Sequence, residues 1–244
     1  HATDALSGIF TIGATAEITQ CTFHKNTAYS YYSDGFSDNF GFGGALGFTD
    51  SKAIIYRCKF TENETDGTGG AVALGSYGRA YFISCLFENN KSKIAGGAIL
   101  NHYGRLELMN CTVVKNSIQE VEEYGPSSVY STWDSYTRIR NSIIYRNDGG
   151  HGLNVEERVY LSHSLIYDGY GLEGSEIKTF DPYFKNFSGR DYHLVPCSEA
   201  VDAGNNAFYD PFTEEDPSTN QLDFSPYNLD LDGMPRQQRG CVDL

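Results

Sequence analysis

The chain has 244 residues, and its 18 basic and 32 acidic residues give a formal net charge of −14. The length suits one elongated domain with a cap. The acidic balance argues against a nucleic-acid partner, because a phosphate backbone is bound by basic stripes. No apolar run is long enough to span a membrane. No signal peptide is visible at the start of the chain, so we expect a fragment or a processed form.

A repeated phrase organises the first two thirds of the sequence. It reads Cys-x-Phe/Val-x-x-Asn, and its copies begin at Cys21, Cys58, Cys85, Cys111 and, in a weaker form, Ser142. A second phrase, Gly-Gly-Ala-aliphatic, stands before three of these copies, at residues 43–46, 69–72 and 96–99. Repeats of this length indicate stacked units that each contact mainly their neighbours.

Apolar residues alternate within each repeat, which is typical of strands. In the copy at Cys85 they are Ala80 and Phe82 before the cysteine and Phe87 after it. The alternation changes phase between these two groups, which requires a bend, and a third short strand follows the Gly-Gly pair. Three short strands in coils of about 22–27 residues predict a parallel β-helix with inward Cys and Phe columns. We expect the coils to occupy residues 1–178 and a capping segment to occupy 179–244.

One asparagine recurs at the end of each repeated phrase. The five positions are Asn26, Asn63, Asn90, Asn116 and Asn147. Equivalent positions of successive coils stack about 4.8 Å apart, so their side chains can hydrogen-bond to one another and to turn backbone. Unrelated surface turns would not explain the common register. The sequence therefore predicts an asparagine ladder.

The six cysteines need two explanations. Four of them share one inward column, where a thiol acts as a small hydrophobe, and we expect these to be free and buried. Disulfides between successive coils are the alternative, but they require a dihedral angle near 90°. Cys197 and Cys241 lie outside the column, and we expect them to form a disulfide that closes a loop of about 44 residues. Such a bond implies an oxidising, extracytoplasmic compartment.

Length variation between repeats is confined to one place, between the asparagine and the Gly-Gly pair, which predicts loops at one edge of the stack. Tyrosine, serine and glycine are common in adaptable recognition loops, since rigid aromatic rings give contact area at low entropy cost. Packing of these aromatics as a local cap is the open alternative. The candidate ligand-binding residues of the first and fourth coils are Tyr29, Tyr31, Tyr32, Phe36, Phe40, Tyr124 and Trp133.

Several outward strand positions are apolar, among them Tyr56, Ile83, Ile143 and Tyr145. A solvated strand face should be polar, and exposed apolar patches mark an interface or a covering segment. We expect the C-terminal segment to cover these positions. Cover by a neighbouring protomer is the alternative.

Asp230 and Asp232 alternate with leucines before Gly233, and hard oxygen ligands at this spacing suit calcium. The distant glutamate of an EF-hand is missing, so an Asp-Gly turn without a metal is the alternative. We expect no other cofactor.

Catalysis is considered because many β-helix proteins cleave acidic polysaccharides. Gly150-His151-Gly152 resembles a polygalacturonase motif, but the acidic motifs that should precede it are missing. Arg79 and Arg105 occupy equivalent turns beside His102, and no carboxylate shares their column. A hydrolase would need paired carboxylates on adjacent coils. The sequence therefore favours a protein that is not an enzyme.

Two resemblances add to this interpretation. The Gly-Gly-Ala-aliphatic and Phe-x-x-Asn phrases resemble the repeats of polymorphic outer-membrane proteins, which are surface-displayed right-handed β-helices associated with adhesion. The segments 180–184, 191–204, 230–236 and 240–243 are similar to the end of secreted bacterial β-helix proteins of the choice-of-anchor type. The resemblances imply a right-handed helix and export to the cell surface, and neither implies a reaction.

Three functions follow as hypotheses. The first is a non-catalytic, secreted or cell-surface β-helix scaffold or adhesin that presents an aromatic loop edge to a glycan or a surface protein. The second is a structural subunit of an extracellular filament or surface assembly, because unpaired strand edges favour self-association. The third is a polysaccharide lyase or glycoside hydrolase, which requires a basic residue close to clustered acids.

Overall fold

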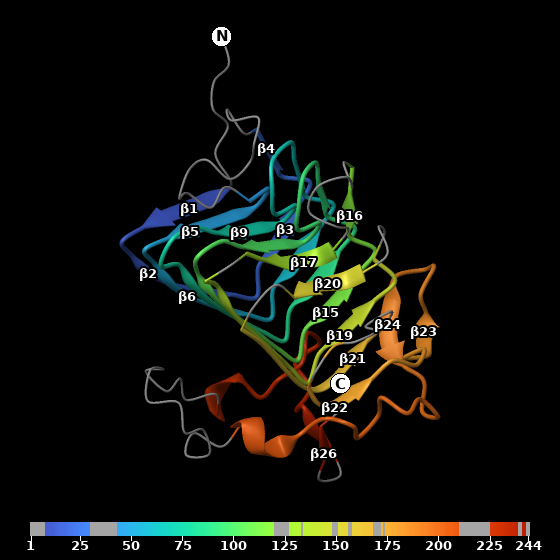
Figure 1. The fold of residues 1–244 in the computed structure, drawn as a ribbon. Coiled ribbons are helices and arrows are strands. Elements are labelled where there is room, and N and C mark those ends of the chain that lie inside the picture. Colours follow the sequence, from blue (N-terminus) through green and yellow to red (C-terminus); the bar gives the residue numbers. More distant parts are fainter. Residues whose placement is uncertain are drawn as a thin grey trace.

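The chain winds as a parallel β-helix in the computed structural model (Figure 1). The structure describes residues 8–29, 43–119, 127–132, 134–147, 151–155, 158–167, 172, 174–209, 225–238 and 241–242. Strands that lie one coil apart in the sequence pair in parallel and in register, for example β10 with β14. The all-β parallel architecture predicted from the repeats is confirmed.

Three parallel sheets form the walls of the helix. The sheet that follows the Gly-Gly phrase contains β1 (Ile9–Ile12), β5 (Leu46–Thr49), β9 (Val72–Leu74), β13 (Ile99–Asn101), β17 (Ser127–Ser131) and β20 (His151–Val155). One half of the large sheet contains β2 (Thr15–Thr19), β6 (Lys52–Tyr56), β10 (Arg79–Ile83), β14 (Arg105–Met109), β18 (Tyr136–Arg140), β21 (Val159–Ile166) and β22 (Ser175–Lys178). Its other half contains β3 (Thr22–His24), β7 (Lys59–Thr61), β11 (Leu86–Glu88), β15 (Thr112–Val114) and β19 (Ile143–Tyr145). The smallest sheet contains β4 (Thr27–Ala28), β8 (Glu64–Thr65), β12 (Lys91–Ser92) and β16 (Ser117–Ile118).

A left-handed residue separates the two halves of the large sheet in each coil. Arg57, Ser84 and Asn110 have φ angles of 54°, 51° and 52°. A single residue in this conformation turns the strand and reverses which side chains point inward. It therefore explains why the apolar alternation changes phase just before each cysteine.

The asparagine ladder is present. Each side-chain amide donates to the Oδ1 atom of the asparagine one coil further on: Asn26 to Asn63 and Asn63 to Asn90 at 2.8 Å, Asn90 to Asn116 and Asn116 to Asn147 at 2.9 Å. The backbone N–H of each donor residue contacts the same oxygen at 2.9–3.0 Å. The ladder thus satisfies buried polar groups at one corner of the coil, as predicted.

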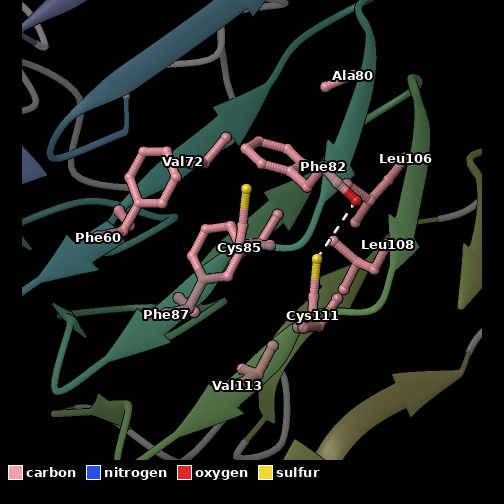
Figure 2. Close-up of a cluster of buried hydrophobic side chains, with 14 of the residues drawn as sticks. Phe60, Val72, Ala80, Phe82, Cys85, Phe87, Leu106, Leu108, Cys111 and Val113 are labelled. Carbon is pink, nitrogen blue, oxygen red and sulfur yellow. Dashed lines mark hydrogen bonds between the residues drawn. The ribbon is translucent and has the colours of Figure 1, made fainter. Parts of the chain in front are cut away.

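Phenylalanine rings fill the interior of the coils (Figure 2). The ring of Phe60 stacks between those of Phe23 and Phe87, with centroid distances of 4.9 and 4.7 Å. Phe82, from the first half of the large sheet, meets Phe87 edge-on at 5.2 Å. These inward columns form one continuous core through the helix.

The cysteine column lies beside these rings, and all four of its thiols are free. Cys58, Cys85 and Cys111 are buried as predicted, whereas Cys21 in the first described coil is exposed. Burial raises the pKa of the Cys85 thiol, so this sulfur stays protonated at neutral pH.

The structure does not show the predicted disulfide between Cys197 and Cys241, and Cys197 is an exposed free thiol. The side chain of Cys241 lies outside the described residues. The bond was expected to restrain a long loop, but noncovalent contacts tie this part of the chain to the coils. The backbone N–H of Leu229, for example, donates to the hydroxyl of Tyr56 at 2.9 Å.

Thiol counting tests whether this bond forms. We expect six titratable thiols per chain in denaturant without reductant, since no described cysteine is bonded. In the native protein Cys197 and Cys21 should react with a thiol reagent much faster than the three buried sulfurs. A count of four in denaturant would restore the disulfide.

The chain after β22 leaves the parallel stack and lies against it, as the orange and red segments of Figure 1 show. Among the described residues, no helix is long and apolar enough to cross a membrane. The elements of this segment are β23 (Phe184–Asn186), β24 (Asp191–Leu194), the 3-10 helices η1 (Asn206–Tyr209) and η2 (Ser225–Tyr227), β25 (Gln237–Gln238) and β26 (Cys241–Val242).

This C-terminal segment covers the outward apolar positions of the large sheet. Ile83 and Met109 are buried beneath Phe208 and Leu229. The second half of the sheet is covered through its own cluster, in which Tyr145 meets Phe187 edge-on at 5.3 Å. The expectation that the C-terminal segment of the same chain covers these positions is confirmed for both halves of the large sheet.

Polar contacts fix the β23–β24 hairpin on the coils. The hydroxyl of Tyr192 donates to Glu88 Oε1 at 2.6 Å, and Arg190 Nε lies 3.1 Å from the same oxygen. Arg190 Nη2 also pairs with Glu62 Oε1 at 2.7 Å. Glu88 is buried on the outer side of β11, so the hairpin compensates a carboxylate that would otherwise be desolvated without partners.

Candidate functional site

The two long insertions leave the coils at the same edge. The first follows β4 and the second follows β16, and both strands belong to the smallest sheet. In that sheet Ala28, Thr65, Ser92 and Ile118 stand in register. Three strand spacings separate the first from the last, so the insertions depart about 14 Å apart. We call this side of the helix the loop edge.

Most of the predicted binding aromatics lie beyond what the structure describes. Tyr29, directly after β4, is 60% exposed at the root of the first insertion. Thr132 and Asp134, the chain neighbours of Trp133, lie in the turn between β17 and β18, a different corner of the coil from the insertion. The predicted residues outside the described part of the chain are Tyr31, Tyr32, Phe36, Phe40, Tyr124 and Trp133.

A second candidate surface lies where the turn after the first sheet meets the large sheet. Arg79 and Arg105 stand in register at the starts of β10 and β14. Tyr77 and Tyr103 occupy the preceding turns and are 78% and 45% exposed. The structure therefore brings together the basic and aromatic residues that the sequence placed in equivalent turns.

His102 belongs to this corner but has a structural environment. Its Nδ1 atom lies 3.2 Å from the hydroxyl of Thr132, and its ring packs on Tyr103 with a centroid distance of 4.3 Å. Burial lowers the pKa of His102, so its imidazole is neutral at neutral pH.

Glu107 is the acid nearest to these basic residues in the register of the large sheet. It pairs with Arg140 one coil further on, and both side chains are buried. The guanidinium of Arg140 also lies 4.9 Å from the ring centre of Phe208. The carboxylate of Glu107 is therefore paired inside the protein, and its partner Arg140 contacts the C-terminal segment.

Asp230 and Asp232 form an Asp-Gly turn. Asp230 Oδ1 accepts hydrogen bonds from the backbone N–H groups of Asp232 and Met234 at 2.9 and 2.8 Å. Asp232 Oδ2 lies 2.6 Å from His193 Nε2. Within the described ranges, no group of three or more His, Cys, Asp or Glu side chains is placed to hold a metal ion. Calcium binding at these two residues stays a prediction.

This turn borders a cavity of about 330 Å³ between the coils and the C-terminal segment. Its floor includes Leu86 and Ile143 of the large sheet, and its rim includes Lys59, His193 and Arg236. Lys59, Leu86, Thr112 and Ile143 occupy the same position in four successive coils. The opposite wall comes from the C-terminal segment, which has no repeat, so the cavity could not be predicted from the sequence. The cavity is lined by both signs of charge, with Arg190 and Arg236 on one side of the balance and Asp230 and Asp232 on the other.

His193 joins two parts of the C-terminal segment. Its Nδ1 atom contacts Asp191, and its Nε2 atom contacts Asp232. The hydrogen bonds to Asp191 and then Asp232 raise the pKa of His193. The hydrogen bond from His193 in turn lowers the pKa of Asp191.

We expect the turn around Asp232 to be held most firmly between about pH 4 and 6.5. The raised pKa of His193 gives a stabilisation that is present below its unfolded pKa and is lost as the pH rises through the folded value. The lowered pKa of Asp191 gives a second stabilisation, which is lost as the pH falls through the folded pKa of Asp191. Hydrogen-exchange protection factors of residues 228–236, measured against pH, check this.

The control for this experiment is His193→Gln. Protection in the variant should no longer fall between about pH 6 and 8, where an imidazole titrates. An unchanged pH dependence would assign the effect to other groups. The pair is exposed to solvent, so the effect should be small.

Comparison with known proteins gives one finding. A family model described as right handed beta helix region matches residues 3–176. Searches of curated proteins and of solved structures found no match. The matched residues run from the first coil to β22 and make up more than half of the 244-residue chain.

Proposed function

Because the chain belongs to the right-handed β-helix family, we propose that it is a non-catalytic scaffold or adhesin, secreted or displayed at the cell surface. Its loop edge presents aromatic side chains to a glycan or a surface protein. The observation that carries this proposal is the common departure of both insertions from one sheet. A ladder and core that hold the roots of two long loops at a fixed spacing suit recognition rather than a moving active site.

The chemistry of the loops supports the same function. The first insertion is rich in tyrosine, phenylalanine, serine and glycine, which combine large aromatic contact areas with adaptable hydrogen bonding. Tyr29 stays largely exposed although its neighbour Ala28 is buried. The resemblance of the repeats to polymorphic outer-membrane proteins supports surface display.

Binding to a glycan array, with purified surface proteins in parallel, tests the proposal. We expect the triple variant Tyr29→Ala, Tyr31→Ala, Tyr32→Ala to lose at least about tenfold in affinity for the ligand that the unchanged protein binds best. The matched control is Tyr183→Ala, because Tyr183 is 58% exposed on the C-terminal segment. Equal losses of affinity in the triple variant and in Tyr183→Ala, or no loss in either variant, would contradict binding at the loop edge.

Two further measurements separate the rival functions. New reducing ends released from polysaccharides in the presence of calcium would show a lyase or hydrolase. Filaments that form with rising protein concentration under electron microscopy would show an assembly subunit. Either result would replace the adhesin proposal.

A further inference from the structure

The cavity between the coils and the C-terminal segment has a charged end and an apolar end. We call it the C-terminal cavity. Its inner wall is the column of Lys59, Leu86, Thr112 and Ile143, so the cavity extends over three strand spacings, about 14 Å. Its volume of about 330 Å³ falls in the range of small-molecule sites, roughly 300–1,000 Å³.

The turn with Asp230 and Asp232 lies at the Lys59 end of the cavity. Arg57, from the same coil as Lys59, donates through Nη2 to Leu231 O at 3.5 Å and so holds the turn over that coil. Asp230 accepts the N–H groups of its own turn through Oδ1, which leaves Oδ2 as an acceptor for a ligand. The ammonium group of Lys59 is exposed on the facing wall.

Two arginines complete this end, and both are held in place by the coils. Arg190 pairs with Glu62 and Glu88 of the first two coils of the wall. Arg236 Nη2 donates to Asn110 O at 3.0 Å. Such contacts fix the long side chains in advance, so less conformational entropy is lost when a ligand binds.

The other end of the cavity is apolar. Ile143 is 1% exposed and belongs to a buried cluster against which Leu194 packs. Leu194 pairs with Phe184, whose ring centre lies 5.8 Å from that of Tyr145, so β24 brings Leu194 to the coil of Ile143. Val201 also lines the cavity. A ligand that fills the cavity therefore needs charged groups at one end and an apolar group at the other.

Both signs of charge meet at the charged end. The glutamates that bind Arg190 neutralise it, which leaves Lys59 and Arg236 as cations facing Asp230 and Asp232. His193 lies 2.6 Å from Asp232 and balances part of the charge of that carboxylate. A ligand with a single charge would meet a like charge here, whereas a ligand with both signs can pair with both sets of groups.

We propose that the C-terminal cavity binds a small zwitterion with an apolar side chain, either a free hydrophobic amino acid or a short peptide of such residues. The carboxylate of the ligand pairs with Lys59 and Arg236. Its ammonium group pairs with Asp230 and Asp232, and its side chain lies in the apolar end. The cavity lies over the large sheet and the loop edge follows the smallest sheet, so this site goes beyond the function proposed above.

Titration calorimetry of the 244-residue chain with L-leucine, L-phenylalanine and L-leucyl-L-leucine tests the proposal. We expect at least one of them to bind, and the comparison of leucine with the dipeptide distinguishes an amino-acid site from a peptide site. N-acetyl-L-leucine lacks the ammonium group, and L-leucine amide lacks the carboxylate. Each should bind at least about tenfold more weakly, since a hydrogen bond to a charged group contributes about that factor. Glycine should lose at least about tenfold because it has no side chain for the apolar end.

Two variants locate the ligand. Lys59→Met should weaken binding at least about tenfold, and Thr112→Phe should abolish it by filling the space between the two ends. The matched control is Lys178→Met, because Lys178 occupies the same column as Lys59 but does not line the cavity. It should bind as the unchanged protein does. Unchanged thermal unfolding verifies the fold of each variant.

Every other outcome contradicts the proposal. If N-acetyl-L-leucine binds as tightly as L-leucine, the site takes anions, and if L-leucine amide does so, it takes cations. Binding that survives both Lys59→Met and Thr112→Phe would place the ligand outside the cavity. If none of the three zwitterions binds, the proposal is refuted, and the glycan array still decides the adhesin proposal by itself.

Discussion

Replacing Phe87 with alanine should lower the free energy of unfolding by about 4 kcal/mol. The ring is fully buried, stacks on Phe60 at 4.7 Å and meets Phe82 edge-on at 5.2 Å. Its removal loses these contacts and leaves a cavity that the stacked coils cannot close, because their backbones are held by ladders on both sides. Urea unfolding followed by circular dichroism measures the change.

Phe23→Ala is the matched control. Phe23 occupies the same column position and stacks on Phe60 at 4.9 Å, but it is only partly buried. We expect less than half of the destabilisation caused by Phe87→Ala, since the removed surface was partly solvated. Equal effects at the two positions would contradict the dependence of the destabilisation on how deeply each ring is buried.

The second large effect concerns the asparagine ladder. Asn90→Ala should lower the free energy of unfolding by about 3 kcal/mol, because an unsatisfied buried polar group costs roughly 1–3 kcal/mol. Asn90 Oδ1 accepts from both the backbone and the side chain of Asn63, at 3.0 and 2.8 Å. Its amide donates to Phe60 O and to Asn116 Oδ1, both at 2.9 Å. The same urea experiment detects the loss.

The end of the ladder provides the control for this substitution. The side chain of Asn26 donates to Asn63 Oδ1, which still receives the backbone N–H of residue 26 when that side chain is absent. Asn26→Ala should therefore cost about 1 kcal/mol, the usual contribution of one hydrogen bond. A loss as large as that of Asn90→Ala would mean that the hydrogen bonds of the ladder do not act locally.

Part of the candidate site could be predicted from the sequence. Arg79 and Arg105 stood in equivalent turns, and the structure places them in one column. His193 gave no signal at all, since the two carboxylates that it joins come from separate turns.

The sequence by itself determined the coils: the three strands, the bend before each cysteine, the asparagine ladder and the edge from which the loops leave. In a stack, the neighbours of a residue are the residues at the same position one repeat away. The repeat spacing in the sequence therefore predicts which residues are in contact. Only the tertiary structure decided how the C-terminal segment lies and that Cys197 stays a free thiol. Its contacts join residues such as Tyr192 and Glu88, 104 positions apart, or Leu229 and Tyr56, 173 apart. No repeat relates such pairs. They form because the C-terminal segment fits the surface of the folded coils in shape and charge.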